Sequence, residues 1–186
     1  MTLPTRAETI AIRTATRADA AALAVLGRRT FIDTFGDANT AADLAMFLDA
    51  TYGEALQQRE LDDPQQTCFI VESDGVLLAF ALLRRGASSP LVPDPAAVEI
   101  RRFYVDRAAH GTGMAQRLMA RCIAYAGEHF APVVYLGVWE RNTRAIRFYA
   151  TQGFTTAGVQ PYRLGNDVQQ DLVLVRRLDT TGSRER

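Results

Sequence analysis

Two glycines stand close together in the stretch HGTGMAQRLM, residues 110–119, and a helical apolar pattern follows them directly. A turn at the start of a helix leaves backbone N–H groups unpaired beside the positive end of the helix dipole. Gly111 and Gly113 lack the Cβ atoms that would hold an anion at a distance. The stretch therefore indicates a binding site for a phosphate group.

Known kinds of glycine-rich turn differ in what surrounds the glycines. A Walker A loop ends in Gly-Lys-Ser/Thr, whereas Met114 and Ala115 follow Gly113 here, so this loop is excluded. A Rossmann fingerprint needs a third glycine and follows the first strand, whereas this chain has Gln116 at that place, deep in the sequence. On the stretch alone, a tight turn without any ligand stays open.

The helix after the turn has one apolar stripe. Its small or apolar residues recur at intervals of three and four: Ala115, Leu118, Met119, Cys122 and Ala126. This spacing predicts an amphipathic helix with one face buried against a sheet. The first helical turn is then anchored, and its free amides are held in place before a ligand arrives.

A second helix with chemical groups is expected over NTRAIRFYATQG, residues 142–153. Asn142 is placed to cap its start, and Gly153 is placed to end it. Asn142 and Tyr149 are seven residues apart, which on a helix returns them to nearly the same face. Both can line one ligand, although Tyr149 taken by itself is equally consistent with core packing.

The remaining elements place these two helices in an α/β domain. Alternating or apolar runs predict strands at 9–16, 67–73, 76–85, 98–106, 132–139, 154–159 and 168–178. Helical patterns occur at 17–35, 40–52, 53–63, 110–130 and 142–153. Three prolines make residues 86–97 a loop. This order predicts a mixed sheet with helices between its strands.

Length and composition narrow the class of protein. The chain has 186 residues, 48% of them apolar and 23% charged, which is typical of one folded domain over residues 1–186. No membrane span or signal peptide is visible, so we expect a cytoplasmic protein that does not enter a membrane. A formal charge of zero argues against nucleic-acid binding. Cys68 and Cys122 stand alone, which indicates buried thiols rather than a metal site or a disulfide.

The charges are unevenly spread along the chain. Residues 33–63 carry eight acids against Arg59 alone, and residues 101–147 carry eight arginines against three acids. The first region could attract a cation and the second an anion. Solvated helix faces would give the same counts, so the charges alone leave both interpretations open.

Two segments, VEIRRFYVDRAAHGTGMAQRLM and YLGVWERNTRAIRFYATQGF, resemble the two main motifs of the GNAT superfamily of acyl-CoA-dependent N-acyltransferases. The resemblance implies a mixed central sheet of about six to seven strands, helices on both faces, and a splay between the fourth and fifth strands. The pantetheine arm of acetyl-CoA would lie in that splay. Backbone groups around Phe103, Tyr104 and Val105 would bond to it, and a β-bulge would free them.

The same resemblance gives the glycine turn a ligand. The turn would grip the pyrophosphate of coenzyme A, mainly through backbone amides of six residues: His110, Gly111, Thr112, Gly113, Met114 and Ala115. The family usually has Gln or Arg at the first of these positions. A histidine there could still donate a hydrogen bond to a phosphate.

The mechanism implied is direct transfer of an acetyl group to a primary amine, with no metal and no covalent enzyme intermediate. Asn142 would contact coenzyme A. Tyr149 would protonate the departing thiolate, since a phenol pKa of about 10 exceeds a thiol pKa of about 8.5. A backbone N–H near Val105 would meet the oxyanion.

Glu99 is the first candidate for the base that takes a proton from the amine. It precedes the place where the thioester would lie on its strand. Strand alternation puts Glu99, Arg101 and Phe103 on one face unless the bulge intervenes. Glu99 could equally serve structurally by pairing with Arg101 or Arg102.

The acceptor amine is suggested by a looser similarity. FIDTFGDANTAADLAMFLDATY and YRLGNDVQQDLVLV are similar to the PaiA branch, which implies a polyamine such as spermidine. Asp33, Asp37 and Tyr52 are the candidate substrate residues. A protein N-terminus, an amino acid or another small amine stays open, as does a regulatory protein that binds acyl-CoA without turnover. A homodimer could form if the C-terminal strand pairs across an edge.

Overall fold

The alternating and apolar runs of the sequence form seven strands of one sheet in the computed structural model, which describes residues 10–87 and 89–179. The strands are β1 (Ile10–Thr14), β2 (Gln66–Ser73), β3 (Val76–Arg85), β4 (Val98–Val105), β5 (Val133–Trp139), β6 (Thr155–Leu164) and β7 (Asp167–Arg177). Their order is β1-β2-β3-β4-β5-β7-β6. Only β4 and β5 pair in parallel, so the predicted mixed sheet is confirmed for the described residues.

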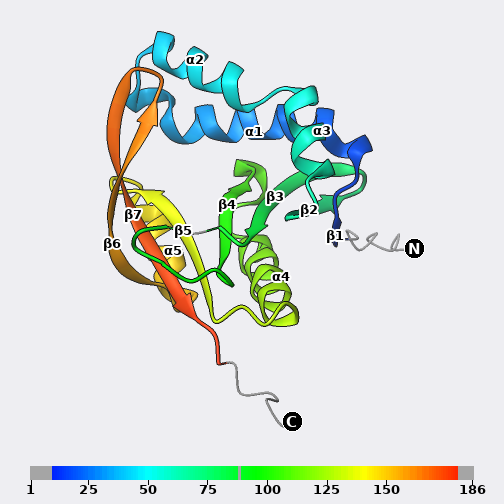
Figure 1. Ribbon diagram of the computed structural model, residues 1–186. Helices are drawn as coiled ribbons and strands as arrows, with labels where there is room; N and C mark the ends of the chain where they lie inside the picture. The colour runs from blue at the N-terminus through cyan, green and yellow to red at the C-terminus, as the bar shows by residue number, and fades with distance from the viewer. Residues whose placement is uncertain (1–9, 88, 180–186) are drawn as a thin grey trace, which may run out of the picture.

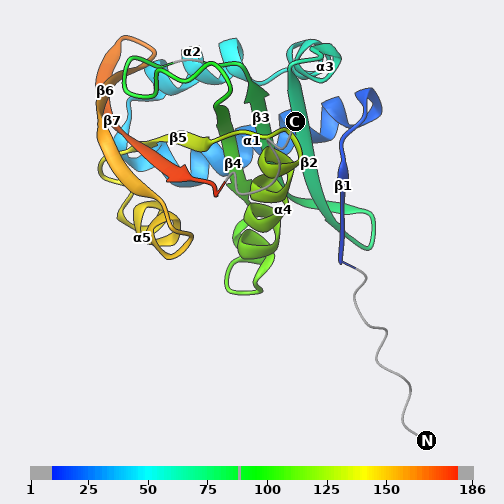
Figure 2. The same ribbon diagram turned by 60° about the horizontal axis from the view of Figure 1, so that its bottom comes forward.

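Helices cover both faces of this sheet, as predicted. They are α1 (Ala20–Phe35), α2 (Ala41–Thr51), α3 (Glu54–Asp62), α4 (Met114–Glu128) and α5 (Thr143–Thr151). Figures 1 and 2 show α1, α2 and α3 on one face and α4 and α5 on the other. The chain therefore offers two distinct sides to any ligand that passes between the strands.

The fourth and fifth strands separate soon after they meet. β4 pairs with β5 only at Val98 with Val134 and at Glu99 with Tyr135. Beyond these two pairs the parallel ladder ends, which confirms the predicted splay. The side of β4 that faces β5 is left without a strand partner over the rest of its length.

A β-bulge changes which way the residues of β4 point. The register with β3 shifts between Leu82 and Leu83 and leaves Arg101 as the extra residue. Ile100 and Phe103 consequently both face the core under α4, although they are three residues apart. Glu99 and Arg101 lie on the opposite side, so the alternation that would place Glu99 with Phe103 does not hold.

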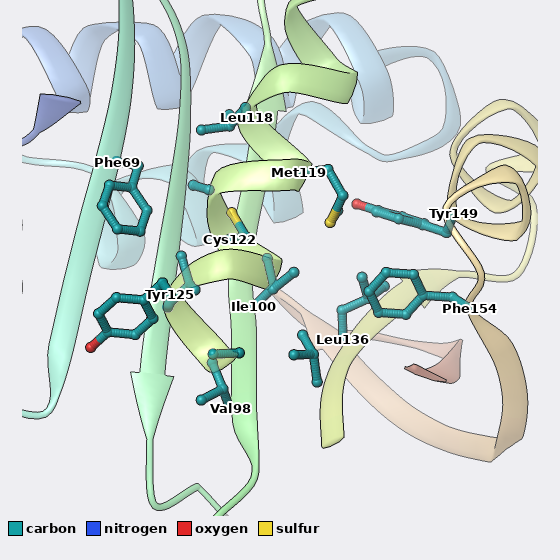
Figure 3. Packing of buried hydrophobic residues seen from close by; sticks show 14 of the residues in the cluster. Phe69, Val98, Ile100, Leu118, Met119, Cys122, Tyr125, Leu136, Tyr149 and Phe154 are labelled. Carbon is teal, nitrogen blue, oxygen red and sulfur yellow. The ribbon is translucent and has the colours of Figure 1, made fainter. Parts of the chain in front are cut away.

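The stripe on α4 packs into the largest core cluster. Leu118, Met119 and Cys122 are fully buried, and Figure 3 shows them against side chains from β2, β4 and β5. Met114 is buried, whereas Ala115, which the spacing assigned to the stripe, is half-buried beside the open groove described below. A buried leucine contributes about 2–5 kcal/mol relative to alanine, so the start of α4 is held firmly.

The C-terminal strand is not an edge of the sheet. β7 pairs with β5 on one side and with β6 on the other. The expectation that this strand could pair with a second copy was therefore wrong, because its backbone groups are already used within the chain. The edges are β1 and β6.

The β6–β7 hairpin is fixed against the start of α2. The backbone N–H of Asn166 donates to the carboxylate of Asp43 at 2.7 Å, and Thr40 caps the same helix. Gly165 has φ +61, and a Cβ there would lie 2.6 Å from the Cα of Asp43. Only glycine allows this close approach.

Two expectations from the composition can be compared with the structure. Cys68 and Cys122 are free and buried, which confirms the interpretation as buried thiols. In residues 10–87 and 89–179, no helix combines the length and the apolar character needed to cross a bilayer.

Candidate functional site

A groove of about 610 Å³ follows the splay between β4 and β5. Its walls come from α1, β4, the turn after β4, the start of α4, β5, α5 and the β6–β7 hairpin. Eleven of the predicted site residues line it: Asp33, Glu99, Phe103, Tyr104, Val105, His110, Gly111, Gly113, Ala115, Asn142 and Tyr149. The fold thus brings predicted residues from α1, β4, the glycine turn, α4 and α5 to one cavity.

The glycine turn presents unpaired amides to this groove. Gly111 has φ +78 and Gly113 has φ +83, a left-handed conformation that favours glycine. A Cβ at either position would meet no atom within 4 Å. Among the described residues, the backbone N–H groups of Gly111, Gly113, Met114 and Ala115 find no backbone acceptor. The free amides and the positive end of α4 have the geometry that the sequence predicted, and the binding of an anion there stays a prediction.

Two residues of the turn contribute no side chain to the groove. The hydroxyl of Thr112 donates to the carbonyl oxygen of Ala109 at 2.6 Å, and Met114 points into the core. Thr112 and Met114 were predicted to act through their backbone amides. Of these two amides, that of Met114 has no backbone acceptor. The amide of Thr112 faces the carbonyl of Ala109 at 3.5 Å.

His110 ties the turn to the end of β4. Its Nε2–H donates to the carbonyl oxygen of Val105 at 3.1 Å, which requires the Nε2-protonated tautomer or the imidazolium. The ring also lines the groove, together with Arg107 and Arg144. His110 therefore ties the turn to β4, a contact that the sequence pattern did not reveal, and the two arginines add positive charge to the groove.

The main-chain groups of β4 divide between β3 and the splay. The N–H of Asp106 donates to the carbonyl oxygen of Leu78 at 2.8 Å. Alternation in an antiparallel ladder then directs the main chain of Tyr104 toward Phe80 and the main chains of Phe103 and Val105 away from β3. Phe103 and Val105 thus face the splay with their backbone, as predicted, whereas Tyr104 presents only its side chain.

α5 carries two polar groups into the groove. The side-chain oxygen of Asn142 accepts from the N–H of Ala145 at 3.1 Å, so the predicted helix cap is confirmed. Tyr149 is 7% exposed and contacts Phe103 and Phe154. Figure 3 shows its ring reaching from α5 toward Met119. Burial raises the pKa of Tyr149 above its ordinary value, so the phenol keeps its proton at neutral pH.

A second cavity of about 540 Å³ adjoins the groove on the side of α2 and α3. The two share five residues: Glu99, Arg101, Arg102, Tyr104 and Tyr162. We call this second space the acceptor-side cavity. It reaches the splay from the face opposite α4, so a molecule in it would approach the β4–β5 gap from across the sheet.

Glu99 and Arg102 give this cavity paired charges. Burial raises the pKa of Glu99, while the nearby Arg101 and Arg84 act in the opposite direction. The Glu99 carboxylate lies 3.9 Å from Arg101. Arg102 forms an ion pair with Glu60 at 2.5 Å. Each carboxylate here therefore has an arginine partner.

The three predicted substrate residues lie in different places. Asp33 is exposed on α1 and lines the groove. Tyr52 is 2% exposed and lines the acceptor-side cavity, with Arg102 over its ring at 5.2 Å. Its buried hydroxyl has no hydrogen-bond partner among the described residues. Asp37 is exposed in a short turn after α1 and lines neither cavity, so the structure does not bring it to the other two.

Most other acids of the region 33–63 are used in local contacts. Asp49 pairs with Arg28, and Asp62 pairs with Arg17. Asp43 accepts from Asn166, as described above. The acidic count in the sequence therefore does not become an acidic wall around the groove.

Sequence reasoning missed Asp171 and Gly137. Both line the groove, and Asp171 is 7% exposed on β7, between β5 and β6. The signal available was a lone acid in the apolar run QQDLVLV. Without the strand order, nothing placed this acid near the glycine on β5.

Comparison with known proteins agrees with this geometry. The family model described as "Acetyltransferase (GNAT) family" matches residues 31–154. An uncharacterised N-acetyltransferase of Mycobacterium tuberculosis is 36% identical over 160 residues, which cover 86% of this chain and 98% of that protein.

Two solved structures share the fold. PaiA N-acetyltransferase from Thermoplasma acidophilum, in complex with coenzyme A, gives a TM-score of 0.74 at 14% identity and covers 91% of this chain and 99% of the other. YncA, a putative acetyltransferase from Salmonella typhimurium with acetyl-CoA, gives 0.71 at 23% identity, with 94% and 97% covered. The family match spans both the glycine turn and the Asn142–Tyr149 helix. This chain belongs to the acetyltransferase (GNAT) family and is an acetyltransferase.

Proposed function

We propose that this enzyme transfers the acetyl group of acetyl-CoA to a primary amine by direct attack. The observation that carries the proposal is the splay, which is lined by the free amides of the glycine turn at one end and by Tyr149 in its wall. A long donor with a phosphate at one end and a thioester at the other fits these two features.

The donor end of the groove suits a pyrophosphate. The backbone amides of Gly111, Gly113, Met114 and Ala115, at the start of α4, have no backbone acceptor among the described residues. Arg107 and Arg144 line the same groove and add positive charge to it. Helix N-termini with free amides bind phosphate groups without any particular side chain, so the unusual His110 is compatible with this role.

Tyr149 supplies the proton that the leaving thiolate needs. Its buried phenol remains protonated at neutral pH because burial raises its pKa. As the carbon–sulfur bond breaks, the phenol O–H donates to the sulfur, and solvent later returns the proton. The backbone N–H of Val105, which faces the splay, is the candidate donor to the oxyanion of the tetrahedral intermediate.

Glu99 is a candidate for the group that removes the proton from the attacking nitrogen. It lines both the groove and the acceptor-side cavity. Its pairing with Arg101 at 3.9 Å supports a structural role equally well.

For the acceptor, a polyamine such as spermidine is the first candidate. Its support is the likeness to the PaiA fold and the presence of Asp33 and Asp171 in the lining of the groove. Carboxylates there would attract a substrate with several ammonium groups.

An amine that also carries a carboxylate, such as an amino acid or a peptide N-terminus, is the second candidate. Three arginines line the acceptor-side cavity: Arg59, Arg101 and Arg102. Since Glu99 and Glu60 face only Arg101 and Arg102, one positive charge is left over in that lining. A carboxylate on the acceptor would complement it.

We also propose a cytoplasmic setting, because free buried thiols such as Cys68 and Cys122 persist in a reducing compartment. A homodimer, if formed, would use the free edges β1 or β6, and light scattering would detect it.

The acceptor is tested by offering spermidine, spermine, free amino acids and short peptides with acetyl-CoA and by following thiol release. Saturable release with spermidine alone supports the first candidate. Release with amino acids or peptides but not with spermidine would reject it. Absence of release with every amine would reject the proposed reaction.

The acid is tested with Tyr149→Phe. This variant keeps the ring packing but loses the donor, so kcat should fall by about 10²–10⁴ while acetyl-CoA still binds. Tyr125→Phe is the matched control, because Tyr125 lies in the core and bonds to Thr67 at 2.9 Å. Equal kcat in the wild type and Tyr149→Phe would contradict the role of Tyr149.

A further inference from the structure

Asp171 is a buried carboxylate that the mechanism above leaves without a task. It is 7% exposed, and its carboxylate forms no hydrogen bond or ion pair with residues 10–87 and 89–179. Buried carboxylates are normally paired or hydrogen-bonded, since desolvation of a charge is costly. An unpaired one that lines a reaction groove therefore calls for a functional explanation.

The position of Asp171 along the sheet places it beside the open part of the splay. It pairs with Trp139 of β5 and with Gln160 of β6. The last β4–β5 pair is Glu99 with Tyr135, four residues before Trp139 on β5. Asp171 therefore lies level with the part of β4 that has separated from β5, where the main chain of Phe103 and Val105 faces the splay.

Gly137 keeps the path from this carboxylate to the splay open. It lies on β5, opposite Val173, which is two residues from Asp171 on the same face of β7. A Cβ at Gly137 would lie 3.1 Å from Oδ2 of Asp171 and 3.3 Å from Nε2 of Gln160. A side chain at position 137 would therefore crowd the carboxylate of Asp171.

Asp171 lies on the acceptor face of the sheet. Val173, two residues along the strand, packs with Tyr135 in the cluster on that face, and Leu172 packs into the core on the other. The charge of Asp171 acts on the pKa of Tyr104 and of Tyr162, which both line the groove and the acceptor-side cavity. An amine that enters from this side passes between these groups.

The geometry points to Asp171 as the general base that accepts the proton from the attacking amine nitrogen. This inference rests on the proposed acetyl transfer and names a second proton-transfer group for it. As the carbon–nitrogen bond forms, the nitrogen becomes more acidic, and one of its protons passes to an oxygen of Asp171. The carbon–sulfur bond then breaks, and Tyr149 protonates the sulfur. Solvent afterwards removes the proton from Asp171.

The charge state of Asp171 agrees with this task. Burial raises the pKa of Asp171 to about 6, so the carboxylate is ionised at neutral pH and remains a better base than an exposed one. Other ionisable groups line the same groove, and none of them contributes to the shift of Asp171, which burial alone causes: Asp33, Glu99, Arg101, Arg102, Tyr104, Arg107, His110, Arg144, Tyr149 and Tyr162. From β5 it faces Gly137, which carries no charge.

Glu99 is less suited to the same step. Its side chain is 29% exposed and lies 3.9 Å from Arg101, which offsets part of the rise that burial gives the pKa of Glu99. It belongs to the segment of β4 that is still paired with β5. The free main-chain groups of β4 and the open splay lie beyond Glu99, which favours Asp171 over Glu99 as the general base.

The test is Asp171→Asn in the full chain, with the amine that gives the fastest thiol release. This variant keeps the shape of the side chain and removes the base. We expect kcat to fall by about 10²–10⁴ and the low-pH limb of the kcat/KM profile near pH 6 to disappear. The Kd for acetyl-CoA, measured by calorimetry, should not change. If Asp171→Asn keeps the wild-type kcat and pH profile, or raises only KM for the amine, the inference is overturned.

Two comparisons make the result specific. Asp167→Asn changes an exposed carboxylate on the same strand that lines neither cavity, and it should keep the wild-type profile. Glu99→Gln tests the rival base: loss of the low-pH limb in Glu99→Gln, with the limb retained in Asp171→Asn, would assign the proton transfer to Glu99 instead.

Gly137→Ala provides a second route if Asp171→Asn does not fold. It retains the carboxylate and places a methyl group 3.1 Å from Oδ2. We expect at least a tenfold lower kcat in a variant with a wild-type circular dichroism spectrum, and unchanged kcat would count against the inference. A wild type that acetylates no amine would instead reject the proposed function itself.

Discussion

Asp171→Asn should also stabilise the folded protein above about pH 6. Burial raises the pKa of Asp171 from an ordinary value of 3.8 to about 6. The folded state therefore binds more protons than the unfolded state between these two values, and stability falls as pH rises through this window. A difference of about two pKa units corresponds to about 3 kcal/mol. The asparagine side chain does not ionise, so the variant avoids this loss.

The assay is urea unfolding of both proteins from about pH 4 to about pH 8, without acetyl-CoA, followed by circular dichroism. The difference in free energy of unfolding isolates Asp171, because the other titrating groups are common to both proteins. It should be small near pH 4 and should grow to at most about 3 kcal/mol in favour of the variant above pH 6. A difference that does not depend on pH, or a wild type that is more stable at pH 8, would refute the reasoning.

Two further predictions concern glycines with positive φ. Gly113→Ala forces an alanine to φ +83 at the start of α4 and places a methyl group where the groove is open. We expect this variant to bind acetyl-CoA at least ten times more weakly in calorimetry. Unchanged binding would contradict the anion site. Gly165→Ala would put a Cβ 2.6 Å from the Cα of Asp43. We expect the free energy of unfolding in urea to fall by about 2 kcal/mol or more, with little change in acetyl-CoA binding. Unchanged stability would contradict the close approach of Gly165 to Asp43.

The donor side of the site could be predicted because its signals are local. The glycine turn, the stripe on α4 and the Asn142 cap each lie within one short segment, and each has a direct physical cause in backbone geometry or helix periodicity. The splay followed from resemblance, and the pairing of β4 with β5 confirms it. What could not be predicted was the bond from His110 to Val105, since it depends on how the turn folds back.

The acceptor side could not be predicted because distant segments assemble it. Asp171 comes to the splay only because β7 inserts between β5 and β6, and its access depends on Gly137 of a different strand. The acidic count of residues 33–63 suggested a polycation. That count omits the arginine partners, such as Arg28 of Asp49 and Arg17 of Asp62, which lie elsewhere in the chain. Charge along a sequence and charge around a cavity are different quantities.

The bulge at Arg101 links the two sides. Before it, Ile100 faces the core; after it, Phe103 does so, under Tyr149, and Tyr104 turns to the acceptor face. In a regular strand, Ile100 and Phe103 would lie on opposite faces, and a shift of one residue would exchange every later side chain between them. One extra residue thus places an aromatic wall beside the donor and a tyrosine beside the acceptor, in the same stretch of β4 that has left β5. The stretch of β4 that separates from β5 is therefore the same stretch in which the bulge directs side chains to the two faces of the sheet.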